Sequence, residues 1–301
     1  MKLRSIMGLR ANTLIGVSLL SCLLSTSVLA AGDDKFSQIN IVPTKLTDTT
    51  YLFVGAGGNI GVSAGPDGIL IIDDQYAPMA DKISQALKNI QPGEPKYIIN
   101  THYHGDHTGG NTHFGEHGSI VAHHNVLKRL ASDPNIAHQA LPVITYEDKI
   151  SVHFNGDTLN VLHLGPGHTD GDSVVMWQDG SVVHMGDLFF KDRFPYIDLK
   201  GGGSVLGYRE NVNQLIQMIN DDAKIIPGHG DLANKADLIR FKHMLDDSIG
   251  WMKAELQAGK SLEKIKAQGV PEKWKDWSWQ FISADKWIET LYLGLTQNQA
   301  Q

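Results

Sequence analysis

The sequence is almost free of cysteine: Cys22 is the only one among 301 residues. A mature chain that begins after residue 30 would have no thiol at all. No disulfide could then form, and no thiolate could act as a metal ligand or as a nucleophile. The sequence therefore excludes a disulfide framework and cysteine chemistry for the mature protein.

Basic residues are also scarce relative to acidic ones. The chain has 26 Lys and Arg against 33 Asp and Glu, a formal charge of −7. Three of the basic residues and none of the acidic ones lie in the first thirty positions. The remainder has 23 basic and 33 acidic residues, a formal charge of −10. A nucleic-acid partner requires a basic face to neutralise phosphates. We therefore predict a small-molecule partner and no nucleic-acid binding, and we predict no particular oligomeric state.

Long apolar runs are confined to the N-terminus. Lys2, Arg4 and Arg10 precede an apolar span from Leu14 to Leu29, and Val28-Leu29-Ala30 has the small-residue pattern of a cleavage site. We predict a secretory signal peptide over residues 1–30 and an exported protein of the bacterial periplasm.

Two other interpretations of this N-terminal segment remain open. The first is a retained anchor, although the apolar core is short and rich in Ser, while a membrane-spanning helix needs about 20 predominantly apolar residues. The second is lipid attachment at Cys22, because Leu19-Leu20-Ser21-Cys22 resembles a lipoprotein box. After cleavage at Ala30 we expect no stable membrane insertion.

Beyond Lys35 the chain has no long linker, repeat or low-complexity tract, so we treat residues 31–301 as one domain. Apolar and β-branched runs predict strands. They lie at 51–54, 60–64, 69–72, 96–100, 119–122, 150–154, 158–162, 173–177 and 181–184. Met79, Ile83, Leu87 and Ile90 follow helical spacing, and a second helix is predicted from Val205 to Ile219. Strands interspersed with helices indicate a layered α/β architecture.

The C-terminal end, residues 235–301, is predicted to be mostly helical and is rich in tryptophan. It contains Trp251, Trp274, Trp277, Trp279 and Trp287. Packing of these rings against the rest of the domain is the simplest explanation. An aromatic wall of a substrate pocket and a subunit contact are the alternatives.

One short segment carries an unusual density of metal-binding groups: His102-Tyr103-His104-Gly105-Asp106-His107. The strand-like run Tyr97-Ile98-Ile99 comes before it, and Gly109 and Gly110 come after it. This context predicts a loop at the end of a strand. In an extended segment side chains two residues apart point the same way, so His102 and His104 could share one metal while Asp106 and His107 face a second.

Three further ligand candidates lie downstream in similar contexts. His168, Asp187 and His229 each follow a short apolar run and each stand beside glycine. Glycine allows the backbone to turn sharply and to approach an ion closely. A histidine-rich surface loop would explain the first segment alone, but it would not explain the downstream set. The sequence therefore favours a metal site with two adjacent positions.

These residues resemble the signature of the metallo-beta-lactamase superfamily, H-x-H-x-D-H followed by a lone His, an Asp and a last His. The resemblance extends from about Thr50 to His229. It implies a four-layer αββα sandwich, with the metals at one edge of the two sheets.

The resemblance also implies a role for each candidate. It assigns His102, His104 and His168 to a first zinc, and Asp106, His107 and His229 to a second. Asp187 falls where many members have an aspartate that bridges both metals. Asp73, at the end of the run Ile69-Leu70-Ile71-Ile72, matches an earlier aspartate that supports the site from behind its ligands.

Imidazole and carboxylate are good Zn(II) ligands, which favours two zinc ions, although carboxylate-rich sites also accept manganese or iron. Two metals about 3.5–4 Å apart would hold a bridging water and lower its pKa from 15.7 toward about 7. The expected reaction is hydrolysis by the resulting hydroxide, with Asp106 orienting the nucleophile and shuttling its proton.

The sequence favours an exported dinuclear zinc hydrolase that cleaves a small ester, lactone or amide. A beta-lactamase proper is the alternative, but the best-known subclass of those enzymes has a cysteine where this chain has Asp187. A di-iron oxidoreductase is a second alternative, although such members usually need a flavin domain as electron donor. A non-catalytic metal-binding protein is the third.

Overall fold

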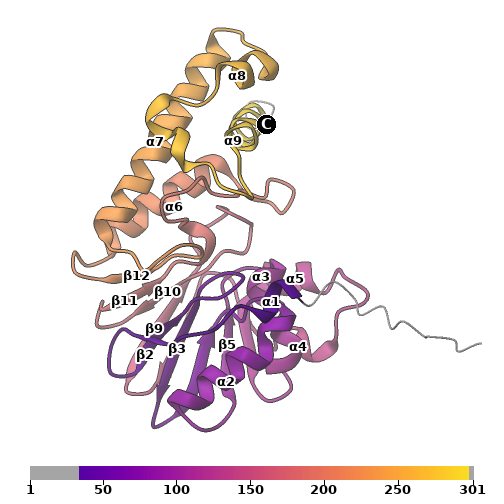
Figure 1. Cartoon of the computed structure of the whole chain (residues 1–301), viewed down its shortest axis with the longest axis vertical. Coiled ribbons are helices and arrows are strands. Elements are labelled where there is room, and N and C mark those ends of the chain that lie inside the picture. Colours follow the sequence, from indigo (N-terminus) through magenta and orange to yellow (C-terminus); the bar gives the residue numbers. More distant parts are fainter. Residues whose placement is uncertain (1–33, 298–301) are drawn as a thin grey trace, which may run out of the picture.

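The structure is a computed structural model that describes residues 34–297, drawn in colour in Figure 1. The predicted signal peptide, residues 1–30, lies outside the described residues. Among the described helices, none is both long enough and apolar enough to cross a lipid bilayer. Two sheets form the body of the described chain.

The first sheet has seven strands in sequence order along the sheet. They are β1 (Thr44–Lys45), β2 (Thr50–Phe53), β3 (Ile60–Gly65), β4 (Gly68–Ile72), β5 (Pro95–Asn100), β6 (Ser119–His123) and β7 (Ile144–Tyr146). Strands β1 to β4 pair antiparallel, whereas β4 to β7 pair parallel. The run 69–72 in β4 is buried along its whole length, as expected for a strand covered on both faces.

The second sheet has five strands in the order β12-β11-β10-β9-β8. They are β8 (Lys149–Phe154), β9 (Asp157–Leu162), β10 (Val174–Trp177), β11 (Val182–His184) and β12 (Lys224–Ile226). Asn155 and Gly156 join β8 to β9 with φ values of 55° and 80°. Positive φ at both turn residues is typical of the tight hairpin that an Asn-Gly pair favours.

Alternation along β4 shows how the layers stack. Ile69 and Ile71 belong to the same buried cluster as Ile83 of helix α2 (Ala80–Ile90). Leu70 and Ile72 point to the other face, where they share a cluster with Val161 of β9. Because successive side chains of a strand face opposite sides, α2 covers the outer face of the first sheet and the second sheet covers its inner face.

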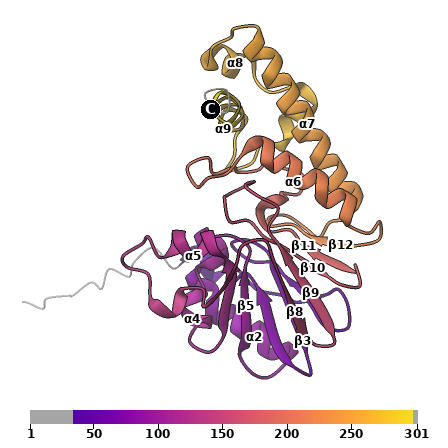
Figure 2. The same cartoon turned by 180° about the vertical axis from the view of Figure 1, so that it is seen from behind.

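The outer face of the second sheet is covered by helices as well. Val174 of β10 and Val183 of β11 are buried in one cluster with residues of α6 (Val205–Met218) and α7 (Lys235–Gln257). Figure 2 shows these helices on the far side of the second sheet from the first. The predicted four-layer αββα order is confirmed.

The remaining helices are short or C-terminal. They are α1 (Asp34–Ser37), α3 (Gly105–Thr108), α4 (Asn111–Phe114), α5 (His124–Leu130), α8 (Leu262–Gln268), α9 (Ala284–Gln297) and the 3₁₀ turns η1 (Ala77–Met79), η2 (His138–Ala140), η3 (Gly186–Leu188) and η4 (Glu272–Trp277). Figures 1 and 2 agree that α7, α8 and α9 gather at one end of the molecule.

The helical character predicted for the C-terminal end is confirmed by α7, α8 and α9. Helix α7 begins with a capping box, in which Asn234 and Asp237 each accept a backbone N–H of the other. Trp287 is fully buried and stacks on Phe194, with ring centroids 5.5 Å apart. Packing therefore explains Trp287, and Trp279 has a different environment that belongs to the site described below.

Two features differ from the sequence-based expectations. Strands β1 and β7 were not predicted, because each has only two or three residues and no apolar alternation. The segment after His104 is not a loop but the single helical turn α3. The amide nitrogens of His107 and Thr108 both donate to the carbonyl oxygen of His104 at 3.0 Å, which closes that turn.

Candidate metal centre

The predicted ligands come from loops at one edge of both sheets. The loop after β5 carries His102 and His104 and leads into α3, which carries Asp106 and His107. The loops after β9, β11 and β12 carry His168, Asp187 and His229. Strands β5, β9, β11 and β12 all end at this edge, so residues more than a hundred positions apart in the sequence meet there. The structure brings all seven together in two groups.

The first group consists of His102, His104, His168 and Asp187. Nε2 of His168 lies 2.8 Å from Nδ1 of His104. Oδ2 of Asp187 lies 3.3 Å from Nε2 of His168 and 3.8 Å from Nε2 of His102. Three imidazole nitrogens and one carboxylate oxygen thus surround a single point.

The second group consists of Asp106, His107 and His229. Nε2 of His229 lies 3.3 Å from Oδ2 of Asp106, and Nε2 of His107 lies 3.7 Å from the same oxygen. Oδ1 of Asp187 approaches this group as well, at 3.1 Å from His107 Nε2 and 3.4 Å from His229 Nε2. The two oxygens of Asp187 therefore face different groups, which is the arrangement of a bridging carboxylate.

The donor atoms point inward because their rings are held from behind. Asp73 accepts from Nδ1 of His107 at 2.7 Å, and the main-chain oxygen of Tyr196 accepts from Nδ1 of His168 at 2.7 Å. A carbonyl oxygen can only accept, so Nδ1 of His168 carries the proton and Nε2 presents its lone pair to the site. The predicted supporting residue Asp73 is found in that position.

The other two rings of the first group are fixed by the same logic. The hydroxyl of Thr101 donates to Asp73 at 2.7 Å, so its oxygen is left to accept from Nδ1 of His102 at 3.1 Å. Nε2 of His104 lies 3.1 Å from the carboxylate of Asp198, leaving Nδ1 as the free lone pair. Lone pairs of several rings thus converge, and they repel one another unless a cation lies between them.

The burial of unpartnered atoms fits a bound metal. Nε2 of His102, Nε2 of His107 and Oδ1 of Asp187 are buried and make no hydrogen bond within the described chain, although the last two form an ion pair at 3.1 Å. Buried polar atoms are normally paired, because leaving one unpaired costs about 1–3 kcal/mol. Imidazole nitrogen and carboxylate oxygen are also the donors that zinc accepts. The residues present therefore fit metal ions.

The charges of the site are strongly coupled. Burial alone would raise the pKa of Asp187, but His107, His229 and His168 together hold that pKa well below its usual value. Burial would lower the pKa of His229, yet Asp187 and Asp106 raise it to about 9. Burial lowers the pKa of His168 to about 4, so its imidazole is neutral at pH 7. The carboxylates of Asp187 and Asp106 are thus ionised. When no metal is bound, protonated histidines such as His229 balance their negative charge.

Two glycines allow the backbone to approach the ligands. A Cβ on Gly58, in the loop between β2 and β3, would lie 2.1 Å from the ring of His107. A Cβ on Gly228 would lie 2.0 Å from Oδ1 of Asp187. No side chain fits at such distances, so both positions require glycine.

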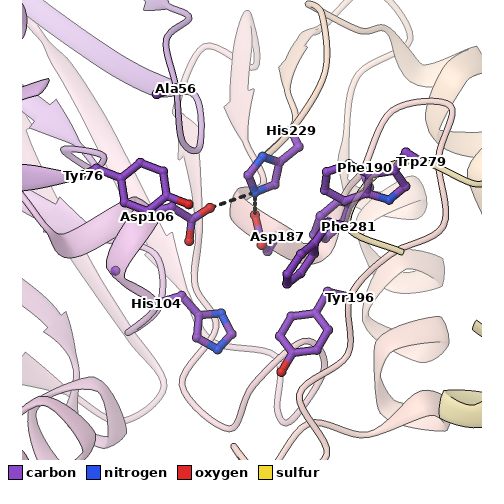
Figure 3. Close-up of a pocket in the computed structure, with 11 residues that line it drawn as sticks. Ala56, Tyr76, His104, Asp106, Asp187, Phe190, Tyr196, His229, Trp279 and Phe281 are labelled. Atoms are coloured by element: carbon purple, nitrogen blue, oxygen red, sulfur yellow. Dashed lines mark ion pairs between the residues drawn. The ribbon is translucent and has the colours of Figure 1, made fainter. Parts of the chain in front are cut away.

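A cavity of about 440 Å³ opens above the two groups (Figure 3). Its floor is formed by four of the predicted ligands: His104, Asp106, Asp187 and His229. One wall is aromatic and consists of Phe190, Tyr196, Trp279 and Phe281. Tyr76 lies on the opposite side. A small molecule in this cavity would lie directly against the candidate metal centre.

Sequence reasoning missed several residues of this site. Asp198 and Tyr196 hold ligand histidines from behind, but they lie in an irregular segment with no recognisable motif. Tyr76 and Phe281 line the cavity without any signal in the sequence. Only their position relative to the folded ligands could have identified them.

Comparisons with known proteins agree with this geometry. The sequence profile described as the metallo-beta-lactamase superfamily matches residues 50–229, which span every predicted ligand. An uncharacterized protein of Mycobacterium leprae is 37% identical over 91 residues, or 30% of this chain and 40% of its own length. The metallo-beta-lactamase domain-containing protein 1 of Xenopus laevis is 29% identical over 143 residues, or 46% of this chain and 56% of its own length. The chain thus spans only about half the length of these curated relatives.

Among solved structures, a metallo-beta-lactamase from Pontibacter korlensis superposes with a TM-score of 0.60. The superposition covers 69% of this chain and 100% of the other, at 16% sequence identity. At that identity the likeness shows a shared fold. The rest of this chain has no counterpart in that structure.

Proposed function

Because this chain belongs to the metallo-beta-lactamase superfamily, we propose that it is a dinuclear zinc hydrolase that cleaves a small ester, lactone or amide. The observation that carries the proposal is Asp187, whose two carboxylate oxygens face two separate groups of ligands on the floor of a cavity. His102, His104 and His168 would hold one ion, and Asp106, His107 and His229 would hold the other. Manganese or iron would suit the same donors.

Bound metal ions would supply Lewis acidity, which makes a water molecule reactive at neutral pH and stabilises negative charge on a substrate oxygen. In the net reaction the acyl carbon gains a bond to the water oxygen and loses its bond to the leaving group. One water proton ends on the leaving group, so no oxidant or reductant is consumed.

The residues of the chain have separate tasks in this reaction. Burial would raise the pKa of Asp106, but His107 and His229 outweigh it and lower that pKa, so the carboxylate is ionised and able to accept a proton. Its side chain is 22% exposed at the cavity floor, whereas that of Asp187 is only 5% exposed. Asp106 is therefore placed to take a proton from water and deliver it to the leaving group.

The aromatic wall has a second task, which is to exclude water from the reacting centre. The rings of Phe190 and His229 stack with centroids 5.0 Å apart, so an apolar surface directly borders the floor. Electrostatic interactions strengthen where water is excluded.

Each of the three alternative functions predicts a different experimental result. A beta-lactamase proper would hydrolyse cephalosporins faster than simple esters. A di-iron oxidoreductase would retain iron and would require an electron donor. A non-catalytic metal-binding protein would hold the metal but turn over no substrate. The superfamily membership and the cavity at the ligands favour the hydrolase.

We test the proposal with purified, zinc-loaded protein and a panel of esters, lactones, amides, phosphodiesters and cephalosporins. Turnover of at least one ester, lactone or amide is expected, and His102→Ala should lower it at least about a hundredfold. His117→Ala is the matched control, since His117 is exposed and lies outside the ligand groups. A zinc-loaded protein that hydrolyses nothing, or a His102→Ala variant with full activity, would overturn the proposal.

We also propose export to the periplasm, supported by the N-terminal pattern of residues 1–30. N-terminal sequencing of the protein from a periplasmic extract should begin at Ala31. A chain that keeps residues 1–30 in the cytoplasm would contradict export. A chain that begins at Cys22 and carries lipid would identify the lipoprotein alternative.

A further inference from the structure

Four aromatic rings form an unbroken wall beside the candidate metal centre (Figure 3). The ring centroids of Phe190 and Trp279 lie 6.1 Å apart, those of Trp279 and Phe281 lie 5.7 Å apart, and those of Phe281 and Tyr196 lie 5.4 Å apart. The first and last of these rings also lie close to ligand histidines: Phe190 stacks on His229, and Tyr196 lies 5.6 Å from His104. The wall therefore runs from one ligand group to the other.

Trp279 is fixed in place and turns hydrocarbon toward the cavity. Nε1 of Trp279 donates to the main-chain oxygen of Phe194 at 2.9 Å, and its backbone nitrogen donates to Ile282 at 3.0 Å. The guanidinium of Arg193 lies 5.0 Å from the indole centroid, a cation–π contact. With its only polar side-chain atom satisfied elsewhere, the indole offers an apolar surface to a ligand.

Part of this wall comes from a segment outside the matched region of the superfamily. Trp279 and Phe281 lie between η4 and α9, whereas the superfamily profile ends at residue 229. The ligands thus come from the region that the superfamily profile matches, while this part of the wall comes from a segment beyond it. Residues that determine a substrate preference of this protein would be expected in such a segment.

The mouth of the cavity exposes aromatic surface to solvent. Phe281 is 49% exposed, and Tyr76, on the opposite side, is 36% exposed. Apolar area left in water is unfavourable, and a ligand that covers both rings would remove it from water. A cavity of about 440 Å³ lies within the range of about 300–1,000 Å³ usual for small-molecule sites.

No Lys or Arg lines this cavity in the described part of the chain. Two basic residues next to the aromatic wall are engaged outside the cavity. Arg193 lies on Trp279, and Nζ of Lys286 donates to the main-chain oxygen of Phe281 at 3.0 Å. A ligand carboxylate placed against the wall, away from the floor, would lose its hydration and gain no Lys or Arg in return. Charge on the part of a ligand that packs against the wall is therefore disfavoured.

We propose that this cavity selects substrates with an uncharged aromatic group next to the scissile bond, and that Trp279 and Phe281 are the residues that determine this specificity. The inference rests on the proposed hydrolytic function, whose substrate class it narrows. The ring of the substrate would pack against the aromatic wall, and its scissile bond would lie over the floor at Asp106 and Asp187.

Three methyl esters test the proposal with zinc-loaded protein: methyl phenylacetate, methyl acetate and monomethyl succinate, with acid release as the readout. We expect kcat/KM to follow that order, with methyl phenylacetate at least about tenfold above the others. Phe281→Ala should raise KM for methyl phenylacetate about tenfold and reduce the preference for it over methyl acetate. Leu293→Ala, which truncates another exposed apolar side chain of the same C-terminal end, is the matched control.

A binding measurement on metal-free protein separates this inference from the proposed function. Saturation-transfer NMR should show contact between the protein and the aromatic protons of methyl phenylacetate, and Phe281→Ala and Trp279→Ala should reduce it. Binding of methyl phenylacetate, together with no turnover of any substrate of the panel by the zinc-loaded protein, would support the aromatic site and overturn the hydrolase. Equal kcat/KM values for the three esters would overturn the aromatic site. So would a saturation-transfer signal from methyl phenylacetate that both variants retain in full.

Discussion

At the scale of single residues, the site depends on the tautomers of its histidines. Asp73, Asp198, Thr101 and the main chain at Tyr196 each engage the outward nitrogen of one imidazole. In His102, His104 and His168 the inward nitrogen then carries a lone pair that can bind a cation directly. His107 differs, because nearby carboxylates raise its pKa, so a metal has to displace its proton.

Substitution of Gly58 tests whether the second ligand group needs the close approach of the loop between β2 and β3 to His107. In Gly58→Ala the new methyl group would lie 2.1 Å from the ring of His107, and that ring cannot retreat because Asp73 holds its Nδ1. We expect the variant to bind about one zinc per chain instead of two, with hydrolysis reduced by at least about a hundredfold. Inductively coupled plasma mass spectrometry measures the zinc content of the variant.

The control for this substitution is Gly250→Ala in α7, where a Cβ would meet nothing within 4 Å. That variant should retain the zinc content of the wild type. A Gly58→Ala protein with two zinc ions and full activity would show that the loop yields, and that the close approach has no functional role.

His229 makes the metal-free protein sensitive to pH. Its folded pKa of about 9 exceeds the value of about 6.5 expected in an unfolded chain. A raised pKa of this kind contributes stability that is fully present below about pH 6.5 and is lost as the pH rises toward 9. The melting temperature of metal-free protein should therefore fall between pH 6.5 and pH 9, measured by circular dichroism.

Zinc should reverse this dependence, because a metal that binds at His229 must displace the proton. Calorimetric titrations at pH 7.5 in buffers of different ionisation enthalpy should detect proton release on zinc binding. His229→Gln should flatten the pH dependence of the metal-free protein. An unchanged slope in that variant would assign the dependence to other groups.

The sequence indicated the candidate ligands and, through the family resemblance, Asp73, but not the other residues that hold the ligands. His102, His104, Asp106 and His107 stand in one recognisable segment, so their spacing alone indicated a metal site. Asp198 is 94 positions from His104, and the segment around it has no motif that links the two. Such contacts follow from loop conformation, which local sequence patterns do not specify.

At the scale of elements, prediction succeeded where burial imposes a pattern. The run 69–72 is apolar because β4 is covered on both faces, and α2 shows one apolar side because it packs on one sheet. Strand β7 shows two exposed residues out of three and carries no such pattern. The turn α3 has only four residues, which are too few to show an apolar pattern, so it was expected to be a loop.

Trp287 tests whether the C-terminal helices are packed as one unit with the sandwich. It is fully buried, stacks on Phe194 and donates from Nε1 to the hydroxyl of Ser248 at 3.2 Å. Trp287→Ala should lower the free energy of unfolding by about 3–5 kcal/mol, the usual cost of removing a large buried ring. Urea unfolding followed by circular dichroism measures the loss.

Trp274→Ala is the comparison, since Trp274 is only partly buried and its Nε1 bonds to Asp247 near the surface. This substitution should lower the free energy of unfolding clearly less than Trp287→Ala does. Equal costs would mean that α9 is held by contacts other than the buried indole.

At the scale of the whole molecule, the candidate metal centre joins the two sheets. The loop after β5 and the turn α3 belong to the first sheet and carry four of the ligands. The loops after β9, β11 and β12 belong to the second sheet and carry the other three. Each proposed ion takes ligands from both sheets, so bound metal would stabilise the sandwich as well as serve catalysis.

The most direct test of the account is the number of metal ions that one chain holds. Native mass spectrometry of zinc-loaded wild-type protein should show a mass increase of two zinc ions per chain, and Asp187→Asn should lose at least one of them. A wild-type chain that holds no zinc, or an Asp187→Asn chain that still holds two, would contradict the shared centre on which the proposed function depends.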